Sequence, residues 1–175
     1  MTNWLDVIRS RISIRTFGER KLTREQQGRV RKLVPDTATG PLGTRSRYFL
    51  WDPAEDEIAE LSGMVTYGVI RGRPVYLACA SVPTLEGLVD LGYRTEEIIL
   101  SLTEAGFGTC WVGGTFSKRK MKKAFPDEDG LIVHALSPIG IPAERPAFID
   151  TFMKRAARSV TRKQWSQLFF TVNGN

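Results

Sequence analysis

Two arginines and a serine alternate near the start of the chain, in the pattern Arg11-x-Ser13-x-Arg15. An extended backbone would point these three side chains to one face and pack Ile12 and Ile14 inward. Arginine offers a planar, permanently charged fork, and serine adds a short hydroxyl donor. The segment therefore predicts a site for a phosphate or a polarised carbonyl. The alternative interpretation is an edge segment whose arginines are simply solvated.

A second candidate is the run Gly-Phe-Gly-Thr-Cys-Trp-Val-Gly-Gly at residues 106–114. It follows an amphipathic helical pattern, continues as a short apolar stretch and ends on Gly113 and Gly114. Because glycine has no Cβ, a backbone at such a place can approach a flat ligand closely. The alternative is an ordinary strand that ends in a turn.

Together, these two motifs and the long helical pattern between them resemble the FMN-dependent nitroreductase family. The arginine-serine motif extends to Phe17, and the second motif covers residues 108–114. The TM-type nitroreductase branch is the most similar, because it shares Gly-Val-Ile-Arg-Gly-x-Pro at residues 68–74 and Asp-Leu-Gly-Tyr at residues 90–93. The similarity extends from about residue 8 to residue 170.

The resemblance implies an FMN site with two ends. Arg11, Ser13 and Arg15 are expected to hold the FMN phosphate and the pyrimidine side of the flavin. The backbone amides of Gly113 and Gly114 are expected near flavin N5 and O4.

A basic residue near the end of the domain should also help to hold the phosphate. Arg162 is the residue we assign to this role, with Lys163 and Arg158 as alternatives.

The resemblance further implies an oxidoreductase that passes hydride from NAD(P)H to a nitroaromatic or quinone-like acceptor by a ping-pong mechanism, as a homodimer. Such chemistry resides in the cofactor and needs no protein acid or base. We accordingly interpret Asp90, Glu96, Glu97 and Glu104 as the solvated side of the long helix. The alternative function is a non-catalytic or truncated nitroreductase-like domain that acts in oligomerisation or small-ligand binding.

One family feature is missing from the sequence. Many members carry a Pro-Ser-x-x-Asn-x-Gln-Pro-Trp-like segment whose serine and asparagine contact the flavin, and the nearest candidate, residues 39–45, lacks the asparagine. We expect that segment in a second half that would follow Phe170. The chain is therefore expected to correspond to the first half of a longer protein.

Apolar periodicity and turn residues predict an α+β fold: helices around a mixed, largely antiparallel sheet of about four strands. At 175 residues the chain is expected to form a single domain over residues 1–170, with a frayed tail at 171–175. Helices are expected at residues 3–10, 23–34, 53–62, 84–105, 118–124, 145–155 and 161–170. Strands are expected at residues 47–51, 71–80, 107–112 and 130–141, with a loop at 36–44.

The net charge of +6 suggests nucleic acid as a possible partner, with basic clusters at residues 118–123 and 154–163. Lysines on the short helix predicted after Ser117 are typical of a solvated face. No helix-turn-helix spacing, zinc-finger spacing or aromatic RNA-binding motif accompanies them, so we do not expect nucleic acid to bind.

The remaining chemistry-bearing residues indicate neither a metal site nor a disulfide. Cys79 and Cys110 lie in apolar, strand-like surroundings and are expected to be buried free thiols, which fits a reducing cytoplasm. His134, the single histidine, is expected in the core or on a sheet face. No apolar run approaches the roughly 18 residues that a membrane span requires, so we expect a cytoplasmic protein without a membrane partner.

Overall fold

A computed structural model describes residues 2–53, 55, 70–114, 116–125, 130–144 and 164. Within these ranges the chain forms four helices and five strands. The helices are α1 (Trp4–Ser10), α2 (Arg24–Leu33), α3 (Leu85–Glu104) and α4 (Lys118–Ala124). The strands are β1 (Thr37–Thr39), β2 (Arg45–Trp51), β3 (Val75–Ser81), β4 (Gly108–Thr109) and β5 (Ile132–Gly140).

The five strands form one sheet in the order β1-β2-β3-β5-β4. Each pairing between these strands is antiparallel, and isolated parallel bridges join Ser13 to Thr109 of β4 and Thr16 to Arg71. The predicted α+β fold with a mixed, largely antiparallel sheet is therefore confirmed. The expected strand count was one too low, because β1 lies inside residues 36–44, which were predicted to be a loop.

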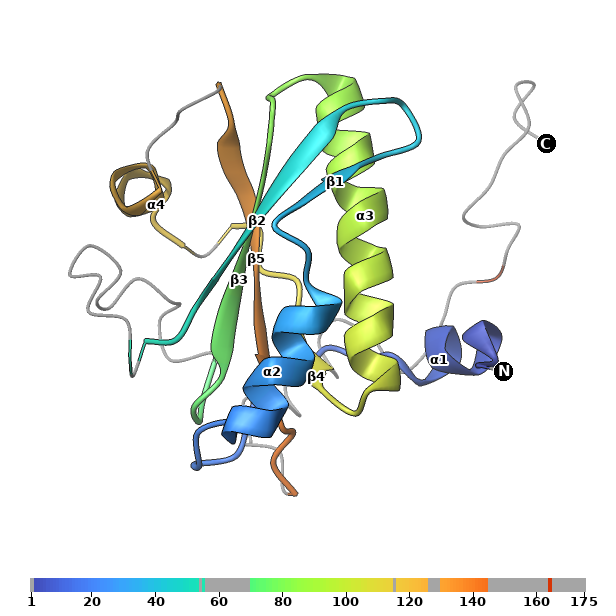
Figure 1. The fold of residues 1–175 in the computed structure, drawn as a ribbon, viewed down its shortest axis with the longest axis vertical. Helices are drawn as coiled ribbons and strands as arrows, with labels where there is room; N and C mark the ends of the chain where they lie inside the picture. The colour runs from blue at the N-terminus through green and yellow to red at the C-terminus, as the bar shows by residue number, and fades with distance from the viewer. Residues whose placement is uncertain are drawn as a thin grey trace.

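Helices cover both faces of the sheet, with α2 and α3 on one face and α4 on the other (Figure 1). All seven residues of β3 are buried, in agreement with its central place in the strand order. Successive strand side chains point to opposite faces. Leu77 and Cys79 accordingly pack in the cluster that includes α3, whereas Ala78 and Ala80 pack with Met121 of α4.

The helix starts follow the capping residues visible in the sequence. The Thr23 hydroxyl accepts a hydrogen bond from the Gln26 amide, and the Gln26 side chain accepts one from the Thr23 amide, so a complete capping box starts α2. Thr84 caps α3, and Gly106, with φ of +86°, follows its end. Ser117 caps α4 in the same way.

Asp90 corrects the interpretation of the acidic residues on α3 as solvated. Its side chain is fully buried and accepts hydrogen bonds from the Leu42 amide at 2.8 Å, the Thr44 amide at 2.7 Å and the Thr44 hydroxyl at 2.6 Å. A Cβ at Gly40 would overlap this carboxylate. Asp90 therefore docks the β1–β2 turn on α3, and residues 39–45, the nearest match to the missing family segment, have a structural role.

The carboxyl of Asp90 is held in its charged form. Burial would by itself raise its pKa, but the hydrogen bonds from Thr44 and Leu42 outweigh burial and hold the pKa below its usual value. The docking of the turn therefore depends on ionised Asp90.

Cys79 and Cys110 are buried, as expected, and burial raises the pKa of the Cys79 thiol to about 12. Leu88 of α3 is 45% exposed. None of the helices in the described ranges has the length and hydropathy of a membrane span.

Several sequence predictions lie wholly or mostly outside the described residues. These are the helices at 53–62, 145–155 and 161–170 and the tail at 171–175.

We predict that Asp90→Asn lowers the melting temperature by roughly 5 °C at neutral pH, because an amide nitrogen would face a backbone donor. The folded-state pKa of Asp90 lies below its unfolded value of about 3.9, so its stabilisation is present above that pH and is lost as pH falls through the folded pKa. The difference between mutant and parent should therefore shrink below about pH 4. Calorimetry across pH measures the difference in melting temperature, with the exposed Glu104→Gln as the control. A difference that stays constant with pH would contradict the prediction.

Candidate functional site

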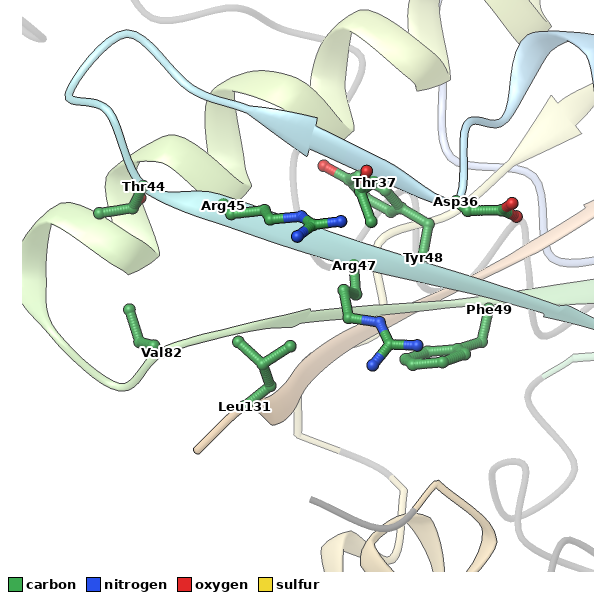
Figure 2. Close-up of a pocket in the computed structure, with 9 residues that line it drawn as sticks. All are labelled: Asp36, Thr37, Thr44, Arg45, Arg47, Tyr48, Phe49, Val82 and Leu131. Carbon is green, nitrogen blue, oxygen red and sulfur yellow. The ribbon is translucent and has the colours of Figure 1, made fainter. Parts of the chain in front are cut away.

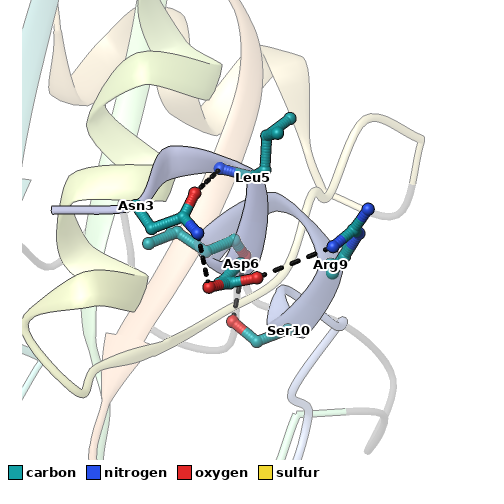
Figure 3. A network of polar contacts seen from close by, with 6 residues as sticks. Asn3, Leu5, Asp6, Arg9 and Ser10 are labelled. Carbon is teal, nitrogen blue, oxygen red and sulfur yellow. Dashed lines mark hydrogen bonds and ion pairs between the residues drawn. The ribbon is translucent and has the colours of Figure 1, made fainter.

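Helix α1 leads directly into the arginine-serine segment, which pairs with the sheet. The Asn3 side chain accepts from the Leu5 amide at 3.2 Å and donates to Asp6 at 2.7 Å, while Arg9 lies 3.7 Å from the same carboxylate (Figure 3). The helix ends at Ser10, and Arg11 has the extended dihedrals φ −62° and ψ 121°. The change from helix to extended chain thus occurs where the arginine motif begins, as the sequence predicts.

The extended segment then pairs with two distant parts of the chain. Ser13 forms a parallel bridge with Thr109 of β4, and the Ile14 amide donates to the Thr109 carbonyl at 2.8 Å. Further on, the Arg71 amide donates to the Arg15 carbonyl at 2.8 Å. The motif therefore lies beside β4, which ends at Thr109 instead of extending to residue 112 as predicted, and the chain continues from there to the paired glycines. Thr109 is four residues before Gly113, a span of at most about 14 Å.

In this region Gly108 is the glycine at which β4 and the arginine-serine segment approach each other closely. A Cβ on Gly108 would lie 2.9 Å from Cγ2 of Ile14, so the absence of that atom lets the segment pack on β4. Gly113 and Gly114 are exposed, and a Cβ on either would meet nothing within 4 Å. The paired glycines therefore present open backbone rather than an internal contact.

The alternation predicted for the segment holds only in part. Ile14 packs against Gly108, but Ile12 is 52% exposed instead of packed inward. Arg11, Ser13 and Arg15 are each partly buried, so none is a freely solvated surface side chain.

Arg11 has one partner and one open donor. Its Nε lies 3.3 Å from Oε1 of Glu96, whereas its Nη1 is buried and has no hydrogen-bond partner within the described part of the chain. Buried donors are normally paired. An anionic ligand could accept the hydrogen bond that Nη1 lacks.

Glu96 is a second correction to the solvated interpretation of α3. Besides contacting Arg11, its Oε2 accepts a 2.7 Å hydrogen bond from the Trp111 indole. Glu97, by contrast, pairs with Arg94 at the surface, in agreement with the prediction. Sequence reasoning missed Glu96 and Trp111 as a pair because no short motif joins two residues that are neighbours only after folding.

A separate cavity of about 820 Å³ lies against β1 and β2 and includes none of the predicted site residues. Figure 2 shows its lining, in which Arg45, Arg47 and Phe49 extend from β2. Because the sheet order places β1 and β4 at opposite edges, this cavity does not combine with the arginine-serine segment.

Three further sequence predictions concern the basic residues near the end of the chain, metal binding and His134. Arg162 and its alternatives Lys163 and Arg158 lie outside the described residues, so the second phosphate contact stays a prediction. In the described ranges no group of three His, Cys, Asp or Glu side chains could hold a metal ion. His134 lies on β5 with Nε2 3.2 Å from the Ser81 carbonyl, which is the expected sheet position.

We predict that Gly108→Ala destabilises the protein by about 1–3 kcal/mol, because its methyl group would overlap Ile14 and displace the arginine segment. Gly113→Ala is the matched control, since its methyl group meets open space. Denaturant unfolding of both variants measures the difference. Equal stabilities would show that the packing on Gly108 has no energetic importance.

Comparison with known proteins places the chain in a family. Residues 3–171 match the family model described as "Putative TM nitroreductase". A "Putative NADH dehydrogenase/NAD(P)H nitroreductase" of Methanothermobacter thermautotrophicus is 23% identical over 159 residues, which cover 85% of this chain and 82% of the relative.

Solved structures share the fold. A nitroreductase family protein of Clostridium difficile 630 superposes with a TM-score of 0.68 at 20% identity, covering 98% of this chain and 99% of its own. A Desulfovibrio desulfuricans nitroreductase solved in complex with FMN gives 0.68 at 17% identity, covering 98% and 97%. These two relatives are covered almost entirely, so the second half that we expected is not part of them. On the match over residues 3–171, the chain belongs to the TM nitroreductase family.

Proposed function

We propose that this chain is an FMN-dependent oxidoreductase that passes hydride from NAD(P)H to nitroaromatic or quinone-like acceptors in a ping-pong cycle. Family membership supports a flavin oxidoreductase, as does the FMN complex of the Desulfovibrio relative. The name of the Methanothermobacter relative supports a nicotinamide as the donor. The observation that carries the proposal concerns Arg11, which lies on the segment that pairs with β4. Its Nη1 is buried and has no hydrogen-bond partner in the described part of the chain.

The residues at the phosphate end fit the cofactor. Arg11 has a buried Nη1 without a hydrogen-bond partner in the described part of the chain, and Ser13 and Arg15 follow it on the same extended segment. A phosphate accepts strong, charge-assisted hydrogen bonds from such groups. The three residues would hold the phosphate of FMN, and the guanidinium of Arg15 would also serve the pyrimidine side of the ring.

The glycine end fits the ring of the cofactor. Gly113 and Gly114 lie two to three residues after Trp111, and the space above them contains no protein atom within 4 Å of an added Cβ. Their backbone amides would therefore be accessible to the flavin edge. FMN, when bound, would supply the hydride chemistry, and the protein would supply position and a partly buried, positively charged surrounding.

A homodimer is the assembly that we propose for the active form. Leu88, Val89 and Tyr93 form an exposed apolar stripe along α3, and Trp4 and Leu5 expose further apolar surface on α1. Helix α1 contacts α3, so these residues belong to neighbouring elements. An exposed apolar patch of this kind favours burial against a second copy.

The alternative is a non-catalytic or truncated domain of the same fold that acts in oligomerisation or small-ligand binding. Titration of the purified protein with FMN, with oligomer mass measured in the same sample, separates the two functions. Oxidation of NADH or NADPH by the yellow protein supports the oxidoreductase. A protein that stays colourless with added FMN and leaves the nicotinamide unconsumed supports the alternative.

We predict that Arg11→Ala and Arg15→Ala each weaken FMN binding by about 10- to 100-fold, equivalent to about 1.5–3 kcal/mol for a charge-assisted contact. Equilibrium titration measures the affinity, and thermal melting without ligand checks that folding is less affected. Arg9→Ala is the control, because Arg9 is an exposed arginine that pairs with Asp6. Unchanged FMN affinity in both site variants would refute the phosphate assignment.

We also predict that Gly113→Val lowers the flavin content of the purified protein strongly while leaving its melting temperature nearly unchanged. The reason is that its side chain would enter the space assigned to the flavin edge, and a Cβ at this position meets no atom within 4 Å. The ratio of flavin absorbance to protein absorbance measures the content. Parental flavin content in this variant would argue against the backbone contact.

A further inference from the structure

We infer that Glu96 is a positioning residue that orients the guanidinium of Arg11 toward the phosphate. The inference rests on the proposed function, since the phosphate is that of FMN. Its basis is a single carboxylate on α3 that contacts both the arginine segment and Trp111, close to the paired glycines.

The two oxygens of Glu96 have separate partners. Oε1 lies 3.3 Å from Nε of Arg11, and Oε2 accepts from the Trp111 indole at 2.7 Å. A carboxylate engaged on both sides has a fixed orientation. Its helix is also fixed, because neighbouring residues Thr95 and Ile98 are buried against the sheet.

The contact at Nε determines what the rest of the guanidinium can do. The guanidinium is planar and rigid, so an arginine held at Nε presents its Nη atoms in a defined direction. Nη1 is buried without a partner in the described part of the chain. Glu96 therefore takes one donor of Arg11 and leaves another for an anion.

The contact with Trp111 connects the same carboxylate to the other end of the site. Trp111 precedes Gly113 by two residues and is partly buried against the core. The hydrogen bond from the Trp111 indole therefore anchors the carboxylate that contacts Arg11.

Electrostatics alone makes the opposite prediction, which gives the inference a sharp test. A carboxylate next to an anion-binding arginine repels the anion, so its removal should tighten FMN binding. If Glu96 acts by positioning, its removal should weaken FMN binding in spite of the gain in positive charge. The sign of the change decides between the two.

The experiment compares FMN and riboflavin affinities of Glu96→Gln and Glu96→Ala with those of the parent. Glu97→Gln is the matched control, since it removes the same charge from the next residue of α3 without contacting Arg11. We expect both Glu96 variants to bind FMN about tenfold more weakly, the loss typical when an orienting partner is removed. Riboflavin, which lacks the phosphate, should bind nearly as to the parent, and Glu97→Gln should bind both ligands like the parent.

A double-mutant cycle with Arg11→Ala separates positioning from a general structural effect. In an Arg11→Ala background, Glu96→Ala should no longer change FMN affinity. Equal or tighter FMN binding by Glu96→Gln, or an undiminished effect of Glu96→Ala without Arg11, would overturn the inference. Glu96→Gln keeps the volume of the side chain, so it remains informative if Glu96→Ala does not fold.

Inorganic phosphate, followed by phosphorus NMR, distinguishes failure of the inference from failure of the proposed function. A parent protein that binds phosphate but not FMN would refute the proposed function, and weaker phosphate binding by Glu96→Gln would then still support the positioning role. Unchanged phosphate binding in that variant would overturn the role. A parent that binds neither ligand would overturn both.

Discussion

The candidate site depends on one long-range backbone pairing. The extended segment after α1 is held by Thr109 on one side and Arg71 on the other. The Ile14 amide donates to the Thr109 carbonyl and the Arg71 amide donates to the Arg15 carbonyl, each at 2.8 Å. These bonds join parts of the chain that are more than fifty residues apart. Without them the arginines would lie on a free N-terminal strand and could not form a fixed anion site.

Two glycines make this pairing sterically possible. Gly108 admits Ile14, and a Cβ on Gly72, which has φ of +88°, would overlap the backbone of Phe17. Phe17 is almost completely buried and anchors the far end of the segment. The pattern of arginine, serine and aromatic residues thus has a physical explanation. The apolar residues fix the backbone, and the polar residues lie between them.

Helix α3 supports both ends of the sheet through acidic residues that face inward. Asp90 holds the β1–β2 turn, and Glu96 holds Arg11 together with Trp111. Neither acid performs chemistry in the proposed function. Both acids connect a helix that is already fixed by apolar packing to a segment distant in the sequence.

The sequence predicts the local structure well and the pairing of polar residues poorly. The helices at residues 23–34, 84–105 and 118–124 could be predicted because local signals fix their starts, where Thr23, Thr84 and Ser117 each cap a helix over three residues. The roles of Asp90 and Glu96 could not be predicted. In the helical pattern, an acidic residue that is solvated looks the same as one that binds a distant part of the chain. The three-residue strand β1 was not predicted for a related reason: its pairing with β2 defines it, and its own residues show no strand pattern.

The location of the site illustrates what distinguishes a binding site from a large cavity. The cavity beside β1 and β2 is spacious and contains Arg45 and Arg47, but Arg45 is exposed and can be satisfied by water. At the β4 edge, the Nη1 of Arg11 is shielded from water and unpaired in the described structure. An unpaired buried donor destabilises the chain alone, and an anion that completes it removes that cost. A ligand bound there would therefore stabilise the fold through linkage, which makes the small, incomplete edge a stronger candidate than the large, solvated cavity.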